Sequence, residues 1–155
     1  MAGYDDATEN YLAGIQNRLY AQGLTGVHTK NIPQHITLCS YPVEQEGILK
    51  EKLRSIAAKT EAFEVSLSHV GIFDGGNVLF IAPDKDRKLI ELKEIFGEAY
   101  GWVPHTTMLI DESENIKKAL PTVLDGFKPF CATVTCLHLY EFWPTRPILT
   151  VYFKQ

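Results

Sequence analysis

The sequence predicts an α+β fold in which two similar halves, or lobes, enclose a central cleft. Three observations lead to this prediction. The predicted helices and strands alternate along the chain, each half offers a strand, a helix and a β-hairpin, and one short motif occurs once in each half. We expect duplicated β-α-β-β units related by a pseudo-twofold axis, with two antiparallel sheets around the cleft and the helices outside.

The first half begins with a helix over residues 7–22, whose apolar residues recur at helical spacing until Gly23 ends it. A short strand over residues 34–41 follows. The next helix, over residues 44–60, has acidic residues first and basic residues later, as the helix dipole favours. A β-hairpin closes this half, because two β-prone runs flank a glycine-rich turn. Its strands cover residues 63–73 and 77–82, with residues 74–76 as the turn.

The second half repeats this order after a helix that is capped by Asp84 and extends to about residue 100. A strand over residues 102–110 precedes a helix that Ser113 caps and that extends to about residue 124. A second hairpin follows, with strands over residues 128–142 and 146–153. The apolar pattern of residues 65–73 matches that of residues 132–140 without a gap, which supports an internal duplication.

All 155 residues should form a single domain that is long enough to bury a hydrophobic core. No apolar run approaches the roughly 18 residues of a membrane span, and the N-terminus lacks the basic and apolar segments of a signal peptide. The sequence therefore predicts neither a membrane protein nor a secreted one.

Charge and cysteine content restrict the partners. The formal net charge is −4, whereas proteins that follow long nucleic acids usually present a basic surface. Any nucleic-acid contact should therefore involve one end or one nucleotide. Three cysteines are an odd number, which argues against a disulfide framework and favours a reducing cytoplasm. Cys131 and Cys136 are spaced to face opposite sides of a strand, so they are not a zinc pair. We expect a cytoplasmic monomer that binds neither long nucleic acid nor membrane.

The motif common to both halves is His-x-Thr on a predicted strand, found at His35 and Thr37 and again at His105 and Thr107. Residues two apart in a strand point to the same face, so each histidine and its threonine should face the cleft together. A pseudo-twofold axis would then bring two imidazoles and two hydroxyls around one small anion. A single copy is usually structural, but two copies at matching positions favour a catalytic site.

This set of groups suits hydrolysis of a 2′,3′-cyclic phosphate. The reaction needs a base that activates water and an acid that protonates the leaving sugar oxygen, and histidine can serve as either near neutral pH. Threonine hydroxyls can donate to the non-bridging oxygens, where negative charge grows in the transition state. We expect His35 and His105 to be catalytic, Thr37 and Thr107 to bind the phosphate, and no metal or other cofactor to be needed.

The doubled motif resembles that of the two-histidine (2H) phosphoesterase superfamily, in particular its bacterial 2′-5′ RNA ligase-like and cyclic phosphodiesterase members. The resemblance covers roughly residues 7–155. It implies a bilobal fold, metal-free catalysis by the two histidines, and action on 2′,3′-cyclic phosphates or 2′-5′ linked RNA or nucleotides. It also implies a 2′-phosphate product and allows the reverse 2′-5′ RNA ligation. The segments that carry it are His35-Ile36-Thr37-Leu38, Val70-Gly71-Ile72-Phe73 and Pro104-His105-Thr106-Thr107-Met108-Leu109.

One departure from the superfamily concerns the N-terminus. Its members usually begin with a β-strand before the first helix, and here only residues 1–4 precede that helix. The sequence leaves open whether this strand is absent or shortened.

Other residues are weaker candidates. Phe73 and Tyr140 occupy equivalent ends of the hairpin strands, where an aromatic side chain either stacks on a nucleobase or packs at the rim of the core. Trp143 and Arg146 flank the second hairpin turn and either cover a base and its phosphate or decorate the surface. Cys39 should share a face with His35, but a zinc site there lacks a fourth ligand. The alternative functions are a nucleotide or RNA-end binding module without catalysis and a zinc-dependent hydrolase.

Overall fold

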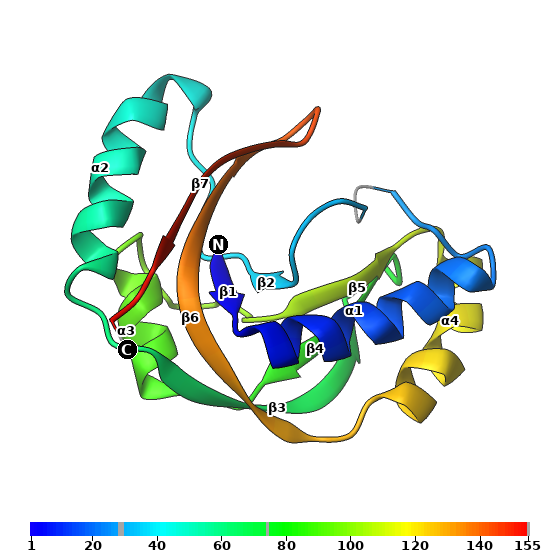
Figure 1. Ribbon diagram of the computed structural model, residues 1–155. Helices are drawn as coiled ribbons and strands as arrows, with labels where there is room; N and C mark the ends of the chain where they lie inside the picture. Colours follow the sequence, from blue (N-terminus) through cyan, green and yellow to red (C-terminus); the bar gives the residue numbers. More distant parts are fainter. Residues whose placement is uncertain (28–29, 74, 155) are drawn as a thin grey trace.

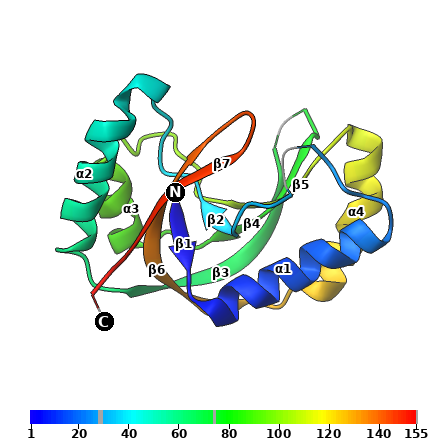
Figure 2. The same ribbon diagram turned by 45° about the horizontal axis from the view of Figure 1, so that its top comes forward.

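The computed structural model describes residues 1–27, 30–73 and 75–154 (Figure 1). His28 and the predicted turn residue Asp74 lie outside these ranges. Within them the chain forms a seven-stranded antiparallel sheet that curves strongly. Helices α2 and α3 lie beside the part of the sheet that contains β6 and β7, and α1 and α4 lie beside the part that contains β5 (Figures 1 and 2).

The predicted helices and strands are present in the predicted order, and β1 and the 3₁₀ turn η1 are additional. The strands are β1 (Ala2–Tyr4), β2 (His35–Ile36), β3 (Phe63–Ile72), β4 (Val78–Pro83), β5 (Thr106–Ile110), β6 (Phe130–Glu141) and β7 (Arg146–Tyr152). The helices are α1 (Asp6–Ala21), the 3₁₀ turn η1 (Val43–Gln45), α2 (Glu46–Ala57), α3 (Arg87–Glu94) and α4 (Ser113–Gly126).

The strand order reflects the internal duplication. Along the sheet the strands run β2-β1-β6-β3-β4-β5, so β6 corresponds to β3, β1 to β4 and β2 to β5 about the centre of the sheet. The central pair is antiparallel, and Val65 on β3 lies opposite Ala132 on β6. These two residues begin the apolar runs that match in the sequence. The pairing places the two His-x-Thr segments at corresponding positions of the two lobes.

One expectation about the sheet was wrong, and one question that the sequence left open is answered. We expected two antiparallel sheets, but the ladder between β3 and β6 joins the lobes into one continuous sheet. A short strand does precede the first helix, and it is internal, because β1 pairs with β2 on one side and with β6 on the other. All three residues of β1 are buried. A strand of three residues is too short for its burial pattern to be recognised in the sequence.

Several predicted boundaries were also wrong for local reasons. The strand predicted over residues 34–41 is reduced to His35–Ile36, because the short β1 offers it only two paired positions. Asp86 caps α3 by accepting from the Leu89 N–H at 2.9 Å, whereas Asp84 accepts from the Ser68 hydroxyl. The strand predicted from residue 102 begins at residue 106, after Pro104, which lacks the N–H needed for a ladder. Ser113 begins α4 instead of capping it, and that helix ends at residue 126.

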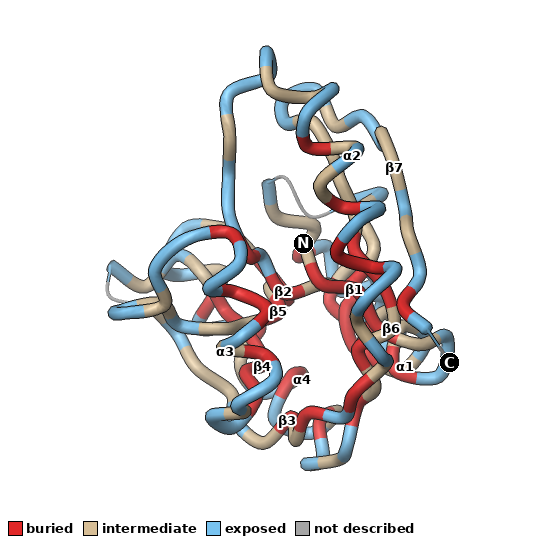
Figure 3. Tube along the Cα trace, turned by 90° about the vertical axis from the view of Figure 1, so that its left-hand side faces the viewer, coloured by how far each residue is buried: buried red, intermediate tan, exposed pale blue. Residues whose placement is uncertain are grey.

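The core lies between the sheet and the inner faces of the helices, where Figure 3 shows the buried segments. Leu12, Ile15 and Leu19 of α1 are fully buried at helical spacing, together with Leu67 of β3 and Met108 of β5. None of the helices in the described chain is long and apolar enough to span a membrane.

Candidate active site

The middle residue of each His-x-Thr segment anchors the segment in the protein interior. Ile36 is fully buried, and Thr106 is 1% exposed, with its hydroxyl hydrogen-bonded to the Tyr4 hydroxyl at 2.8 Å. Because neighbouring residues of an extended chain point in opposite directions, the residues on either side of each anchor face away from the core. His35 and His105 are partly buried, and Thr37 is exposed.

Both histidines are oriented by the same hydrogen bond. His35 Nδ1 lies 2.7 Å from the Pro33 carbonyl oxygen, and His105 Nδ1 lies 2.8 Å from the Val103 carbonyl oxygen. A carbonyl oxygen only accepts, so Nδ1 carries the hydrogen in each ring. In the neutral form, Nε2 is therefore the basic nitrogen of both imidazoles. The sequence repeat thus produces two equivalent rings, each able to accept or return a proton at Nε2.

Two phenylalanines hold the ring of His105. Phe73 contacts it edge-to-face with ring centroids 4.7 Å apart, and the Phe80 ring centroid lies 5.3 Å away. Phe80 pairs with Gly71 across the β3–β4 ladder, and a Cβ atom on Gly71 would clash with the Phe80 ring. Phe73, which the sequence suggested as a base-stacking residue, therefore lies against His105. Phe80 was not identified from the sequence.

The environment of His35 favours its neutral form. Burial lowers the pKa of His35 to about 4, although the hydrogen bond to the Pro33 carbonyl works in the opposite direction. Positive charge on the Met1 amino terminus, and to a smaller extent on His138 and His105, contributes to the lowered pKa of His35. Burial also lowers the pKa of His138 to about 4. His138 lies on β6 outside the repeated motif, and its Nδ1 bonds to the Thr150 hydroxyl at 2.8 Å.

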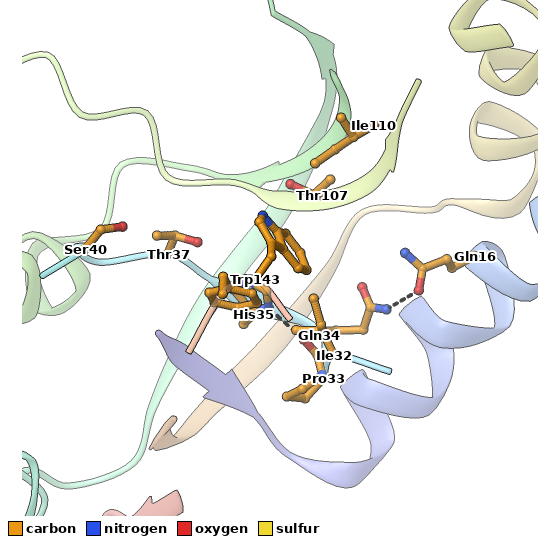
Figure 4. Close-up of a pocket in the computed structure, with 11 residues that line it drawn as sticks. Gln16, Ile32, Pro33, Gln34, His35, Thr37, Ser40, Thr107, Ile110 and Trp143 are labelled. Carbon is orange, nitrogen blue, oxygen red and sulfur yellow. Dashed lines mark hydrogen bonds between the residues drawn. The ribbon is translucent and has the colours of Figure 1, made fainter. Parts of the chain in front are cut away.

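A cavity of about 280 Å³ opens beside the first motif (Figure 4). His35 and Thr37 line one side and Thr107 lines the other, so three of the four motif side chains border it. His105 is not among its lining residues. The remaining walls carry apolar, amide or hydroxyl side chains, and come from Gln16, Ile32, Pro33, Gln34, Ser40, Ile110, Phe142 and Trp143.

Two buried glutamines connect the two motifs. The Gln16 amide nitrogen donates to the Met108 carbonyl at 3.0 Å, and the Gln16 amide oxygen accepts from the Gln34 side chain at 2.9 Å (Figure 4). Since the Met108 carbonyl can only accept, it fixes the orientation of both amides. Gln34 precedes His35, and Met108 follows Thr107. The Glu9 carboxylate completes the connection by accepting from the Gln34 backbone N–H with both oxygens, each at 2.9 Å.

We expect Gln16→Leu to destabilise the protein by about 1–3 kcal/mol, because it leaves the Met108 carbonyl and the Gln34 amide buried without their partners. Urea unfolding measures the change. Gln22→Leu is the matched control, since Gln22 is exposed at the C-cap of the same helix and its side-chain amide oxygen accepts from the Thr122 hydroxyl at 2.9 Å. Equal stabilities of the two variants would show that the glutamine connection carries no free energy of folding.

The remaining sequence candidates have other partners. Tyr140 packs against Phe142 with ring centroids 6.2 Å apart and borders a second cavity. Trp143 lines the first cavity and is 49% exposed. Arg146 forms ion pairs with Glu46 at 2.7 Å and with Glu141 at 2.6 Å. Cys39 lines the second cavity, and the described residues contain no cluster of three or more His, Cys, Asp or Glu suited to a metal ion.

Sequence reasoning missed Glu9, Gln16 and Gln34 because their bonds join distant segments. A signal for Gln16 was present, since it lies on the same face of α1 as Leu12, Ile15 and Leu19. A polar residue within an apolar helical stripe usually has a buried hydrogen-bond partner. The identity of that partner could not be read from the sequence.

Comparison with known proteins gives one family and one fold. A family model of the 2′-5′ RNA ligase superfamily matches residues 5–142. No curated protein matches the chain.

Among solved structures, E. coli LigT in its apo form has a TM-score of 0.62 at 18% identity, over 99% of this chain and 95% of that chain. LigT complexed with NADP+ has a TM-score of 0.63 at 19% identity, with the same coverage. LigT complexed with 3′-AMP has a TM-score of 0.57 at 21% identity, over 92% of this chain and 93% of that chain. At identities of 18%, 19% and 21%, the structural similarity to LigT establishes the fold of this chain.

Proposed function

Because the chain belongs to the 2′-5′ RNA ligase superfamily, we propose that it is a metal-independent phosphoesterase that hydrolyses 2′,3′-cyclic phosphates or 2′-5′ linked nucleotides. The proposal rests on one observation. Both histidines bond through Nδ1 to a carbonyl two residues earlier in the chain, which leaves Nε2 of each ring for proton transfer. Thr37 and Thr107 line the cavity together with His35, and their hydroxyl donors suit a phosphate group.

In the proposed reaction His35 is the general base and His105 the general acid. Neutral His35 takes a proton from water at Nε2 as the water oxygen attacks phosphorus. The bond from phosphorus to the leaving sugar oxygen breaks, and protonated His105 donates its Nε2 proton to that oxygen. For a 2′-phosphate product the leaving oxygen is the 3′ oxygen. Thr37 and Thr107 donate hydrogen bonds to the non-bridging oxygens, and exchange with solvent restores both rings.

The assignment of the base follows from the surroundings of His35. With its pKa lowered to about 4 by burial, His35 is neutral at pH 7 and ready to accept a proton. As a general acid it would need to be protonated, and only about one molecule in a thousand would qualify at pH 7. The substrate arrives as an anion, which favours the imidazolium that forms as the water proton is transferred.

The proposed function is tested by hydrolysis of 2′,3′-cyclic AMP in the presence of EDTA, with separation of 2′-AMP from 3′-AMP by chromatography. We expect 2′-AMP as the product and no loss of rate with the chelator. Binding of 2′-AMP without hydrolysis of 2′,3′-cyclic AMP would favour the non-catalytic binding module. Loss of activity in EDTA that zinc restores would favour the zinc-dependent hydrolase.

The pH dependence tests the assignment of the base. As pH falls, kcat/KM should decline only near pH 4, because the free enzyme keeps His35 neutral well below the ordinary histidine pKa of about 6.5. A decline centred near pH 6.5 would contradict this assignment. Circular dichroism at each pH distinguishes titration of His35 from unfolding of the protein. In His35→Ala, the residual kcat/KM should show no decline near pH 4.

A further inference from the structure

The threonines of the two motifs are held by different means. Thr107 lies within β5 and is paired with Phe80 of β4, so a strand ladder fixes its backbone. Thr37 lies one residue beyond β2, whose last paired position is Ile36. Because β2 is also the last strand at its end of the sheet, the ladder stops before Thr37. The position of Thr37 therefore depends on contacts from outside the sheet.

The indole of Trp102 provides such a contact. Its Nε1–H donates to the Thr37 carbonyl oxygen at 3.1 Å. The ring is partly buried and packs against the hydrophobic core, so the apolar body of the side chain holds the donor in place. Ile36 and Leu38 are buried and anchor the chain on both sides of Thr37. The indole thus fixes the peptide group that follows Thr37, and with it the direction of the threonine side chain.

Trp102 belongs to the same segment as the second motif. Val103 follows it, and the Val103 carbonyl accepts from His105 Nδ1 at 2.8 Å. Pro104 cannot donate to a ladder, which keeps this segment outside β5 and free to contact the first motif. Four consecutive residues therefore bind the threonine of one motif and the histidine of the other. The proximity of β2 and β5 makes this double attachment possible.

The start of the same connection, between α3 and β5, is also held from the first half of the chain. The Tyr41 hydroxyl donates to the Phe96 carbonyl, and the Lys52 amino group donates to the Ile95 carbonyl, both at 2.9 Å. Tyr41 follows the first motif, and Lys52 lies on α2. The connection is thus bound near both of its ends, which gives the Trp102 indole a fixed position from which to donate.

We infer that Trp102 is a positioning residue for the reaction: its indole holds the Thr37 carbonyl and so directs the Thr37 hydroxyl toward the phosphate that Thr107 also binds. The inference rests on the proposed function for the role of the two hydroxyls. Among the described residues that line the two cavities Trp102 is absent, so its effect has to pass through Thr37. Such an effect is substantial, since a misplacement of about 1 Å can lower a rate by about 10²-fold.

Trp102→Phe tests the inference, because it keeps an aromatic ring in the core and removes the indole donor. We expect kcat for 2′,3′-cyclic AMP to fall about tenfold, with a change in KM of less than about twofold. In the Thr37→Val background the same substitution should lower kcat by less than about twofold, because the hydroxyl that Trp102 directs is already absent. A tenfold loss in that background as well would overturn the inference, since a general weakening of the structure affects both backgrounds alike.

Tyr11→Phe is the matched control. It also keeps an aromatic ring and removes a hydrogen bond to a backbone carbonyl, that of Gly126 at 2.9 Å. Tyr11 lies outside the described lining of both cavities. We expect its kcat to stay within about twofold of the wild type. Equal losses of kcat in Tyr11→Phe and Trp102→Phe would assign the effect to lost stability and would overturn the inference.

A measurement without turnover separates this inference from the proposed function. The Leu38 N–H belongs to the same peptide group as the Thr37 carbonyl, so its ¹⁵N order parameter reports how firmly that group is held. We expect about 0.85 in the wild type and in Tyr11→Phe, and a fall toward about 0.6 in Trp102→Phe. An order parameter and a chemical shift that both stay unchanged in Trp102→Phe would overturn the inference, whether or not 2′,3′-cyclic AMP is hydrolysed. If the order parameter falls and the wild type hydrolyses no cyclic phosphate, the proposed function fails and the positioning of Thr37 by Trp102 stands.

Discussion

Replacement of either His35 or His105 by alanine is expected to lower kcat/KM for 2′,3′-cyclic AMP by about 10²–10⁴-fold. Each variant removes one of the two proton transfers of the proposed reaction and leaves the fold intact, because the buried anchors of the segments are the neighbouring residues Ile36 and Thr106. The double variant should be little worse than either single variant, since groups that act in one step are not additive.

His69→Ala is the control for this experiment. The His69 side chain is 63% exposed, and its partners Ser68 and Asp84 lie outside both cavities. We expect its activity to match that of the wild type. Full activity in His35→Ala or His105→Ala would show that the replaced histidine takes no part in the reaction. Circular dichroism and urea unfolding would exclude loss of structure as the cause of a low rate.

Of the four motif residues named from the sequence, three line one cavity and His105 does not, and the reason that the motif could be found in the sequence is geometric. Alternation along an extended chain depends only on residue order, so the common orientation of a histidine and a threonine two residues apart does not require knowledge of the fold. The structure adds the buried residue between them, which fixes that orientation at Ile36 and at Thr106. The duplication was visible for the same reason, because Val65 and Ala132 begin matching alternations and lie opposite one another.

The contacts that hold the site residues in place could not be predicted, because they join segments that are distant in the sequence. Gln16 bonds to the Met108 carbonyl across 92 positions of sequence and to Gln34 across 18. Phe80 reaches His105 only because β4 and β5 pair, and Phe73 reaches it because the β3–β4 pairing holds Phe73 against Phe80, with ring centroids 4.5 Å apart.

Arg146 illustrates a different difficulty. An exposed arginine near a site suggests a phosphate ligand, but α2 supplies Glu46 and β6 supplies Glu141 as its partners. The charge of a side chain can be read from the sequence, whereas its availability depends on residues that only the fold brings near. The joining of two expected sheets into one has the same origin, since the β3–β6 pairing connects strands from different halves.

Removal of one hydroxyl from the cavity, by Thr37→Val or Thr107→Val, is expected to lower kcat by about 10²-fold, with a smaller effect on KM. Valine keeps the shape of threonine and loses only the donor. The negative charge on the non-bridging oxygens grows in the transition state, so the lost hydrogen bond matters more there than in the substrate complex. Thr→Ser at either position retains a hydroxyl and should recover most of the rate.

The double variant Thr37→Val and Thr107→Val decides whether the two lobes act on one phosphate. If each hydroxyl contacts a different non-bridging oxygen of the same phosphate, removal of one hydroxyl also changes how the phosphate is positioned. Removal of the second hydroxyl then acts on a transition state that is already less well stabilised and less well positioned. The combined effect should then differ from the product of the single effects by several-fold, as expected for groups that share a partner. Simple multiplication of the two effects would indicate that the threonines act independently. β2 and β5 pair with no common strand but lie in contact, so coupling between Thr37 and Thr107 can pass through the bound phosphate, through the glutamine connection, or through the Trp102 indole, which donates to the Thr37 carbonyl at 3.1 Å. Repeating the cycle in Gln16→Leu tests the glutamine route and repeating it in Trp102→Phe tests the indole route, so coupling that survives both substitutions is assigned to the phosphate.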